Sequence, residues 1–314
     1  MEYRYDKELM AAIPSFGIFD LTNPAQTREK LRIASKGRPA PDATGVDVKD
    51  YEAPGPDGGG NVFVRVYRPT GIETKLPVVL NIHGGGFVIG RVEVDDGRCL
   101  EMARQIPALI VSVGYRLAPE NPYPAALEDC YAALIWIAGR AADFGADAAR
   151  VGVHGISAGG GLAAALALLA RDKGGPRIIF QYLDMPQLDD RRASVSMRRF
   201  TDTPGWNSVN AEISWRYYLG DIVGRDTVPI YAAPARAKDL TGLPDAYVGA
   251  LEYDPLRSEA VMYAEALFAA GVSVELHVMP SAYHLAYLVP NAKVERRRAD
   301  ERIAVLRRAL CEQY

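Results

Sequence analysis

The chain has 314 residues, 49% of them hydrophobic and 24% charged, which is typical of a globular protein that buries a substantial core as one large domain. A formal net charge of −3 gives no electrostatic reason to expect binding to nucleic acid or to an anionic membrane. The three cysteines are odd in number and widely spaced, which argues against a disulfide framework and fits the reducing cytoplasm.

The N-terminal part of the chain, residues 1–42, precedes the first predicted strand and carries the apolar and aromatic side chains Ile13, Phe16, Ile18 and Phe19. Its first ten residues lack the apolar core of a signal peptide. The longest purely apolar run, Leu162 to Ala170, is too short to span a bilayer and predicts a buried helix. We therefore expect no membrane insertion.

Strand and helix patterns alternate along most of the chain. The predicted strands are 46–52, 61–68, 77–82, 108–114, 150–154, 177–183, 245–251 and 273–279. The predicted helices are 95–105, 124–140, 158–172, 256–270 and 292–310. A loop rich in glycine and proline, 53–60, predicts a hairpin between the first two strands. This alternation predicts an α/β fold with a mostly parallel eight-stranded sheet and helices on both faces.

The strand at 77–82 leads directly into His83-Gly84-Gly85-Gly86-Phe87. Three consecutive glycines cost backbone entropy and specify no packing, so they make sense where bare amides must approach something closely. An oxyanion hole has this need, because its donors must point at the oxygen on which negative charge develops. The amides of Gly84 and Gly85 are the candidate donors, and a flexible or tight turn is the structural alternative.

Residues 151–160, VGVHGISAGG, predict a strand, a sharp turn and a helix, with Ser157 at the apex. The glycines on both sides let the strand and the helix pass close to each other. A serine so placed projects into open space as a nucleophile, and the Ala158 amide is a third candidate oxyanion donor. Alone, the pentapeptide also fits a turn with a capping serine.

Residues 187–228 interrupt the alternation of strands and helices with a polar loop and a predicted helix, Ser208 to Leu219. The segment is rich in aromatic side chains, which are Trp206, Trp215, Tyr217 and Tyr218. Any one of these rings could equally serve only to join the segment to the core.

A serine hydroxyl needs a base, and the chain has only four histidines. His83 opens the glycine loop and we expect it to shape that loop. His154 and His277 lie within predicted strands, where packing roles are expected. His284 follows the last predicted strand, and bases in α/β folds come from loops at the carboxyl ends of strands, so it is the candidate base.

The imidazole in turn needs an orienting carboxylate. Asp254 comes just after the strand 245–251, with Pro255 at a position that tolerates proline at a helix start. Asp254 also fits a plain helix cap, and Glu252 is its local competitor. The order Ser157, Asp254, His284 is the order expected of an α/β-hydrolase triad.

The remaining charged and sulfur-bearing residues have structural interpretations. Residues 296–298 form an arginine run interleaved with acidic residues, which predicts a solvated helix face. No Cys/His cluster has metal-ligand spacing, so neither a metal nor a cofactor is expected.

These motifs together resemble the hormone-sensitive-lipase family of α/β-hydrolases, on its bacterial esterase side, heroin-esterase-like carboxylesterases among them. The matching segments, in order, are HGGGFVIG, YRLAPE, GISAGG, LDMPQLDD, YAAPARAKDLTGLP, DPLRSE and the terminal histidine. The resemblance covers about residues 40–314. It implies a serine carboxylesterase with Ser157 as nucleophile, His284 as base, Asp254 as orienter, and Gly84, Gly85 and Ala158 as oxyanion donors.

The resemblance also implies a helical cap over the serine. Residues 1–42 and 187–228 would form its two parts, and residues 43–186 and 229–314 would form the catalytic domain. Such a cap excludes water and supplies an apolar wall for a small-molecule ester with a short acyl chain. A homodimer is left open.

Two positions depart from the family pattern. Ile156 stands where most relatives carry a polar residue, often Asp, and Ser258 stands where relatives have the second Asp of DPLRDE. Isoleucine can only pack, so we expect Ile156 in an apolar niche beside the serine.

Three alternatives in function stay open at this point. An amidase or an acyltransferase would use the same acyl-enzyme with an amine or an alcohol as acceptor. A catalytically silent hydrolase fold used as a small-molecule receptor is the third, because fold does not dictate function. A receptor has no reason to keep serine, aspartate, histidine and the glycine loop together.

Overall fold

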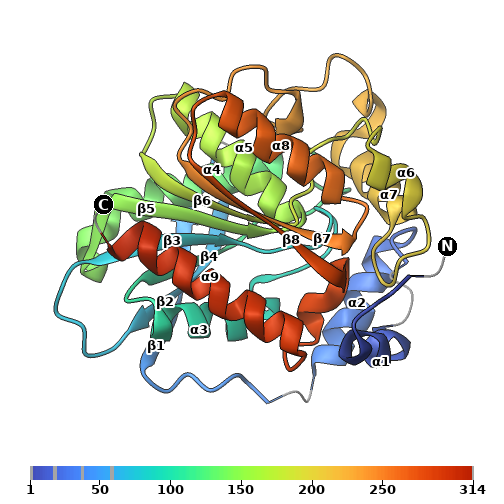
Figure 1. Cartoon of the computed structure of the whole chain (residues 1–314). Coiled ribbons are helices and arrows are strands. Elements are labelled where there is room, and N and C mark those ends of the chain that lie inside the picture. The colour runs from blue at the N-terminus through green and yellow to red at the C-terminus, as the bar shows by residue number, and fades with distance from the viewer. Residues whose placement is uncertain (1–2, 17–19, 37–38, 57–59, 313–314) are drawn as a thin grey trace.

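The computed structural model describes residues 3–16, 20–36, 39–56 and 60–312. Its centre is an eight-stranded sheet with the strand order β1-β2-β4-β3-β5-β6-β7-β8 (Figure 1). β2 is antiparallel to both β1 and β4, and the other neighbouring strands are parallel. The strands are β1 (Val46–Pro54), β2 (Asn61–Pro69), β3 (Leu76–Ile82), β4 (Leu109–Gly114), β5 (Ala146–Ile156), β6 (Ile178–Asp184), β7 (Asp245–Tyr253) and β8 (Val274–Tyr283).

Helices cover both faces of this sheet (Figure 1). On one face lie α3 (Asp96–Gln105) and α9 (Lys293–Cys311), and on the other lie α4 (Ala125–Arg140), α5 (Ala158–Asp172) and α8 (Arg257–Ala269). Short 3₁₀ turns occur at Val92–Val94, Ala141–Phe144, Gly220–Ile222, Pro234–Arg236 and His284–Leu288. The predicted α/β-hydrolase architecture is confirmed.

The side-chain period of the strands explains the two layers. Val78 and Leu80 of β3 belong to the apolar cluster beneath α4 and α5, whereas Val79 between them belongs to the cluster beneath α3 and α9. Every residue of β3 is buried, because a strand covered on both faces has no polar side. This is why the central strands appear in the sequence as continuous apolar runs.

The remaining helices lie together at one end of the sheet, beyond the carboxyl ends of β7 and β8 (Figure 1). They are α1 (Lys7–Phe16), α2 (Pro24–Ser35), α6 (Val195–Arg199) and α7 (Ser208–Leu219). The hydroxyl of Tyr217 in α7 donates to the carbonyl of Thr22, 3.1 Å away. This bond joins the N-terminal segment, which carries α1 and α2, to the segment that carries α6 and α7. The sequence predicted α7 but not the helices α1, α2 and α6. The predicted apolar residues Ile18 and Phe19 lie outside the described residues.

The N-terminal segment is also tied to the main sheet. Arg28 of α2 donates to the carbonyl oxygens of Val88 and Ala118 at 2.7 and 2.6 Å, and it forms an ion pair with Glu120. These bonds join α2 to the segments that follow the glycine loop and β4.

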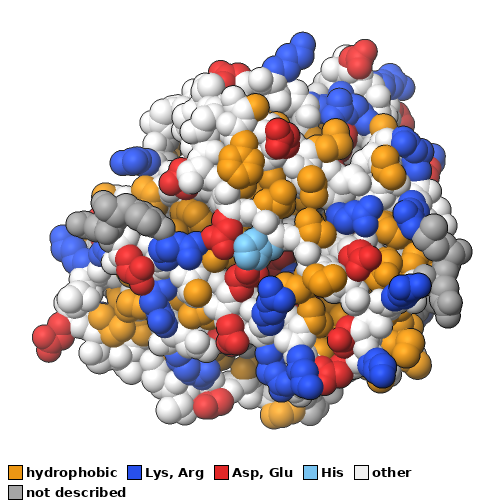
Figure 2. All heavy atoms as spheres, in the orientation of Figure 1, with side chains coloured by type: hydrophobic (Ala, Val, Ile, Leu, Met, Phe, Trp, Pro, Cys, Tyr) orange, Lys and Arg blue, Asp and Glu red, His pale blue; other side chains and the backbone are white. Residues whose placement is uncertain are grey.

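The predicted arginine face is wrong at one of its three positions. Arg296 and Arg297 are exposed, but Arg298 is buried between Glu295 and the end of β6. Helix periodicity explains the difference, since Arg298 and Glu295 are one turn apart on the side of α9 that faces the sheet. On the outer surface shown in Figure 2, Lys and Arg side chains are interspersed with Asp and Glu.

In the described part of the chain, none of the helices combines the length and the apolar run needed to cross a bilayer.

Candidate active site

Ser157 occupies a strained turn between β5 and α5. Its backbone dihedrals are φ 57° and ψ −122°, a conformation that L-residues adopt rarely and at a cost. The Ser157 amide donates to the carbonyl of Asp184 at 2.9 Å. The Ser157 carbonyl accepts from the amides of Gly161 and Gln187, each at 3.0 Å. Three backbone hydrogen bonds therefore hold the turn.

The two glycines around this turn are required by close packing of backbone. A Cβ atom at Gly155 would lie 2.1 Å from the carbonyl oxygen of Gly159. A Cβ atom at Gly159 would lie 2.1 Å from the carbonyl oxygen of Ile82. Neither backbone group can move aside, so the sequence motif reflects contact between β3, β5 and α5.

Ser157, His284 and Asp254 form one continuous polar chain. The Oγ of Ser157 lies 2.8 Å from Nε2 of His284. The Nδ1 of His284 lies 2.7 Å from Oδ2 of Asp254. Asp254 is 1% exposed, His284 2% and Ser157 4%, so the contacts lie in a medium where electrostatic interactions are strong.

The sheet order brings these three residues together. β5, β6, β7 and β8 are consecutive neighbours, and Ser157, Asp254 and His284 follow β5, β7 and β8 at the same edge. β8 extends to Tyr283, so His284 begins a 3₁₀ turn directly after the strand instead of lying farther along a loop. The other carboxylate oxygen of Asp254 accepts from the Leu256 amide at 2.8 Å, which fixes its rotation.

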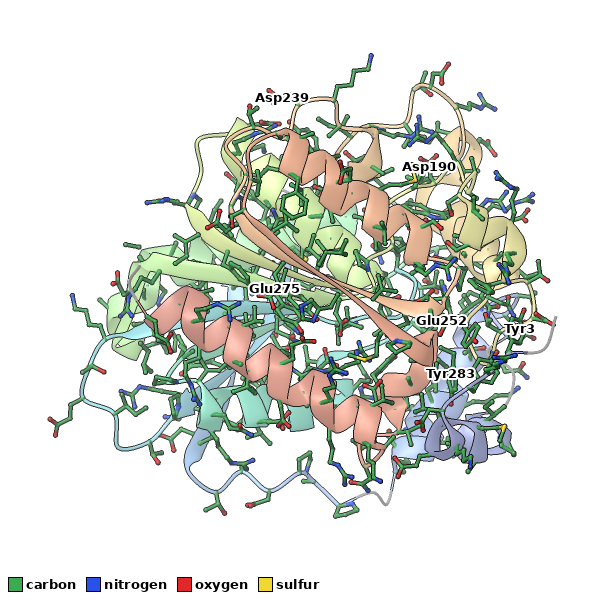
Figure 3. All side chains as sticks on the ribbon, viewed as in Figure 1. Tyr3, Asp190, Asp239, Glu252, Glu275 and Tyr283 are labelled. Atoms are coloured by element: carbon green, nitrogen blue, oxygen red, sulfur yellow. The ribbon has the colours of Figure 1, made fainter. Side chains whose placement is uncertain are left out.

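Glu252, the local competitor of Asp254, has a different role. Its carboxylate accepts from the amide of Ser281 at 2.7 Å. Ser281 has a φ of 58° and lies in the segment that leads to His284. Figure 3 shows Glu252 and Tyr283 at the same end of the sheet as Tyr3. Glu252 thus holds the chain that presents His284, and Asp254 holds the imidazole.

The glycine loop lies against the serine turn. A Cβ atom at Gly84 would lie 3.0 Å from the carbonyl oxygen of Ile156 and 3.5 Å from the Cβ of Ser157. In the described part of the chain, no backbone hydrogen bond uses the amides of Gly84, Gly85 or Gly86. The Ala158 amide is the first of α5 and so has no partner within the helix. The loop offers one more free amide, Gly86, than the sequence analysis named.

Tyr115 supports the glycine loop, a role that its place in the YRLAPE motif did not indicate. Its hydroxyl donates to the carbonyl of His83 at 2.9 Å, and its ring stacks on that imidazole with centroids 4.2 Å apart. His83 in turn contacts the carbonyl of Gly84 through Nδ1 at 2.8 Å. His83 therefore shapes the loop, as the sequence predicted, and burial lowers its pKa.

The other two histidines are also structural. His154 is fully buried, with Nδ1 2.7 Å from Oδ1 of Asn81, and burial lowers its pKa well below the usual range. His277 lies on β8 beside Glu275 and, across from it, Glu301 of α9. Both histidines lie in strands of the sheet, as their positions in the sequence predicted.

One group of side chains in the described chain has the types of atom that bind metal ions close together. It consists of Glu275, His277 and Glu301, whose ligand atoms lie within 4.8 Å of one another. Each imidazole nitrogen of His277 contacts a different carboxylate. Arg308 and the hydroxyl of Tyr247 hold the two carboxylates as well. The group thus has the contacts of a satisfied ion-pair network that joins β8 to α9.

Ser258 makes a reciprocal bond to the α6 segment. Its Oγ accepts from the Ser196 amide at 3.2 Å, and Oγ of Ser196 accepts from the Ser258 amide at 2.9 Å. Oγ of Ser196 also donates to the carbonyl of Pro255 at 2.7 Å. The turn after Asp254 is therefore held by a pair of serines where the family pattern has a carboxylate.

Glu259 is a buried carboxyl group next to this turn. It accepts from the amides of Leu188 and Asp189 at 2.7 and 3.4 Å through one oxygen. Among the described residues, its other oxygen has no partner. Burial raises the pKa of Glu259 well above its ordinary value, with the negative charge of Asp189 adding to the effect.

Ile156 is 1% exposed and belongs to an apolar cluster with Leu251, Met279 and Ala282. The structure therefore places Ile156 in the apolar niche that the sequence predicted.

A buried ion pair lies beneath the serine turn. Both carboxylate oxygens of Asp184 accept from Arg298, at 2.7 and 2.8 Å, and the backbone carbonyl of Asp184 accepts from Ser157. The two residues are 114 positions apart, so no local sequence pattern pointed to this pair.

The chain is similar in sequence to known α/β-hydrolases. A family model described as the alpha/beta hydrolase fold matches residues 79–288. The chain is 42% identical over 265 residues to the carboxylesterase NlhH of Mycobacterium tuberculosis, covering 82% of this chain and 81% of that protein.

Solved structures are similar over nearly the whole length. A bacterial heroin esterase has a TM-score of 0.94 at 44% identity, with 98% of each chain covered. The esterase LipW from Mycobacterium marinum has a TM-score of 0.87 at 38% identity, with 98% of this chain and 96% of that chain covered.

Replacing Ile156 by Asp should lower the melting temperature at pH 7. The change loses apolar burial and places a carboxylate among apolar side chains, at a cost of about 1–3 kcal/mol. Thermal melts of the wild type and the variant test this, with Ile135→Asp on the exposed side of α4 as the matched control. An unchanged or raised melting temperature for Ile156→Asp would show that a polar partner for it exists in the niche.

Glu259→Gln should gain stability relative to the wild type as the pH rises. A carboxyl group whose pKa is raised by folding contributes stability that is present at acidic pH and lost as the pH rises through the folded pKa. Glutamine mimics the protonated form and does not titrate. Melts from pH 5 to pH 9 should therefore show a difference that widens in favour of the variant, whereas Glu265→Gln, exposed on the same helix, should show none. A pH-independent difference would contradict the assignment.

Proposed function

This chain belongs to the alpha/beta-hydrolase family, on its hormone-sensitive-lipase side, and is a carboxylesterase; we propose that it hydrolyses short-chain acyl esters through an acyl-enzyme on Ser157. The observation that carries the proposal is the continuous buried chain from the Ser157 hydroxyl through His284 to Asp254. A serine hydroxyl without such a base is a poor nucleophile at neutral pH.

In the first half of the reaction Oγ of Ser157 attacks the ester carbonyl carbon, and its proton passes to Nε2 of His284. Asp254 stabilises the imidazolium that forms and fixes the ring orientation through Nδ1. His284 then gives the proton to the departing alcohol, which leaves the acyl group on Ser157. In the second half, water attacks the acyl carbon by the same route and releases the acid.

The negative charge of each tetrahedral intermediate falls on the former carbonyl oxygen. We assign the amides of Gly84 and Gly85, with that of Ala158 from the first turn of α5, as its donors. The support is that these amides are free of backbone partners and that Gly84 packs against the serine turn. Burial of the site makes such donors more effective than they would be in water.

The two segments of residues 1–42 and 187–228 form, in this proposal, the cap over the catalytic domain of residues 43–186 and 229–314. Trp206 from the second segment stacks on His284 with ring centroids 5.5 Å apart, and Leu285 packs beside Gly205. These apolar side chains leave little exposed surface at Ser157, which favours small esters over long lipid chains.

An amidase or an acyltransferase would use the same residues, and the acceptor decides among them. The free thiols of Cys99, Cys130 and Cys311 are consistent with action in the cytoplasm. Nucleic acid and membrane are not expected as partners, and the question of a homodimer stays open.

Ser157→Ala should abolish nearly all esterase activity and leave the fold intact. Loss of His284 should be comparably severe and loss of Asp254 somewhat milder, within the roughly 10³–10⁶-fold range typical of triad members. The assay is kcat on p-nitrophenyl butyrate, with circular dichroism for folding and organophosphate labelling read by mass spectrometry. A folded Ser157→Ala variant with wild-type kcat, or a label on another residue, would refute the assignment.

The enzyme should prefer short acyl chains. The measurement is kcat/KM across p-nitrophenyl esters from acetate to palmitate, with the maximum expected between about C2 and C6 because the cap encloses the site. A higher kcat/KM on laurate than on butyrate would overturn the assignment of acyl-chain preference. Faster acyl transfer to an added amine or alcohol than to water would instead support the alternative acceptors.

A further inference from the structure

The carbonyl groups of the glycine loop are held by different parts of the molecule. The carbonyl of His83 accepts from Tyr115, and that of Phe87 accepts from the amide of Ala118 at 2.9 Å. The carbonyl of Gly85 accepts from the amides of Val88 and Ile89 within the loop itself. All of these donors lie in the catalytic domain.

Gly86 is held differently, by the cap. Its carbonyl accepts from the hydroxyl of Ser214 in α7, with Oγ and oxygen 2.8 Å apart. Ser214 is fully buried, and it is separated from Gly86 by 128 positions in the chain. This is a direct polar bond from the cap to the loop that carries the proposed oxyanion donors.

The Ser214 hydroxyl is itself oriented by a second bond. Oγ of Ser214 accepts from the side-chain amide of Gln187 at 3.1 Å. A hydroxyl has a single hydrogen, so accepting from Gln187 leaves that hydrogen for Gly86. The backbone amide of Gln187 also donates to the carbonyl of Ser157. Gln187 therefore connects the serine turn and the glycine loop through Ser214.

The cap also packs closely against the loop at Gly86. Gly86 has a φ of 59°, and a Cβ atom there would lie 2.6 Å from the indole of Trp206 and 3.1 Å from Oγ of Ser214. Phe87 stacks on Tyr218 of α7 with ring centroids 4.0 Å apart. Phe87 also contacts the ring of Trp215 of α7, with centroids 5.4 Å apart, so the cap meets the loop through one hydrogen bond and three aromatic contacts.

We propose that Ser214 is a positioning residue for the oxyanion hole, so that the cap completes the catalytic site and does more than cover the substrate. The proposal rests on the proposed function. A run of glycines has no side chains to fix its own conformation, so its amides depend on external bonds for their direction. The hydroxyl of Ser214 fixes the orientation of the peptide group between Gly86 and Phe87. The preceding amides of Gly84 and Gly85 then stay directed at the substrate oxygen.

This role predicts a loss in the transition state, not in the ground state. In Ser214→Ala, kcat on p-nitrophenyl butyrate should fall about 10- to 100-fold, less than the roughly 10²–10³-fold loss on removal of an oxyanion donor itself. KM should change less than about threefold, because ground-state binding does not use the developing charge. Ser208→Ala is the matched control, since Ser208 begins the same helix and, among the described residues, its hydrogen bond runs to Phe200 and not to the loop, so it should keep wild-type kcat.

A pair of inhibitors distinguishes a loss of oxyanion-hole positioning from a general distortion of the cap in Ser214→Ala. With a short alkyl trifluoromethyl ketone, Oγ of Ser157 attacks the carbonyl carbon and the serine proton passes to His284. The former carbonyl oxygen is then an oxyanion that lies in the oxyanion hole. The corresponding secondary alcohol binds without forming an oxyanion. In Ser214→Ala the Ki of the ketone should rise in step with the loss of kcat/KM, and the Ki of the alcohol should stay nearly constant.

Three outcomes would overturn the role of Ser214. They are a folded Ser214→Ala variant with wild-type kcat, equal weakening of the ketone and the alcohol, and an equal loss in Ser208→Ala. If Ser214→Ala does not fold, Gln187→Met removes the donor that orients the hydroxyl, and it should show the same ketone-specific loss at smaller size. A wild-type protein that neither hydrolyses esters nor binds the ketone would refute the proposed function instead.

Discussion

The strained turn at Ser157 is the constraint on which the rest of the site depends. A residue held at positive φ costs on the order of 1–3 kcal/mol and persists only where its surroundings over-determine it. Here the surroundings are the carbonyl of Asp184 on one neighbouring strand, the amide of Gln187 that follows it, and the backbone contacts that require glycine at 155 and 159. Because β5 lies in the centre of the sheet and α5 packs against it, the direction of the serine hydroxyl is fixed, and His284 and the proposed oxyanion donors are arranged around it.

Two buried ion-pair contacts lie near this turn. Asp254 is paired with His284, and Asp184 with Arg298, whose second partner is Glu295. Unpaired, each of these groups would carry a large desolvation cost in an apolar environment. The two pairs have different consequences: the first stabilises a charge that appears during the reaction, while the second fixes the end of β6, and through its carbonyl it fixes the amide of the nucleophile.

Local pattern predicted the fold class, and it placed Ser157, Asp254 and His284 as candidates that the structure brings into contact. Strand runs followed by glycine, aspartate or histidine predicted where the chain would turn, and parallel strands bring such turns to one edge. Pattern could not find Arg298, which lies in a charged helix that looked solvated, or Ser214, whose partner is 128 residues away. Nor could it show that Ser258 would bond to Ser196. These contacts depend on how the helices pack on the sheet, and many other side chains of similar type would fit the same local pattern.

The order of the strands has a consequence for how activity is lost. β8 is the outermost strand on its side of the sheet, with one hydrogen-bonded neighbour and a partly exposed surface, and it presents His284. Ser157 is presented by β5 near the centre, where the strands are buried on both faces. Openings that release only an edge strand require less free energy than global unfolding. Such an opening would separate His284 from Ser157 while most of the sheet stays intact, so we expect heat inactivation to begin with a local opening at β8, before the whole protein melts.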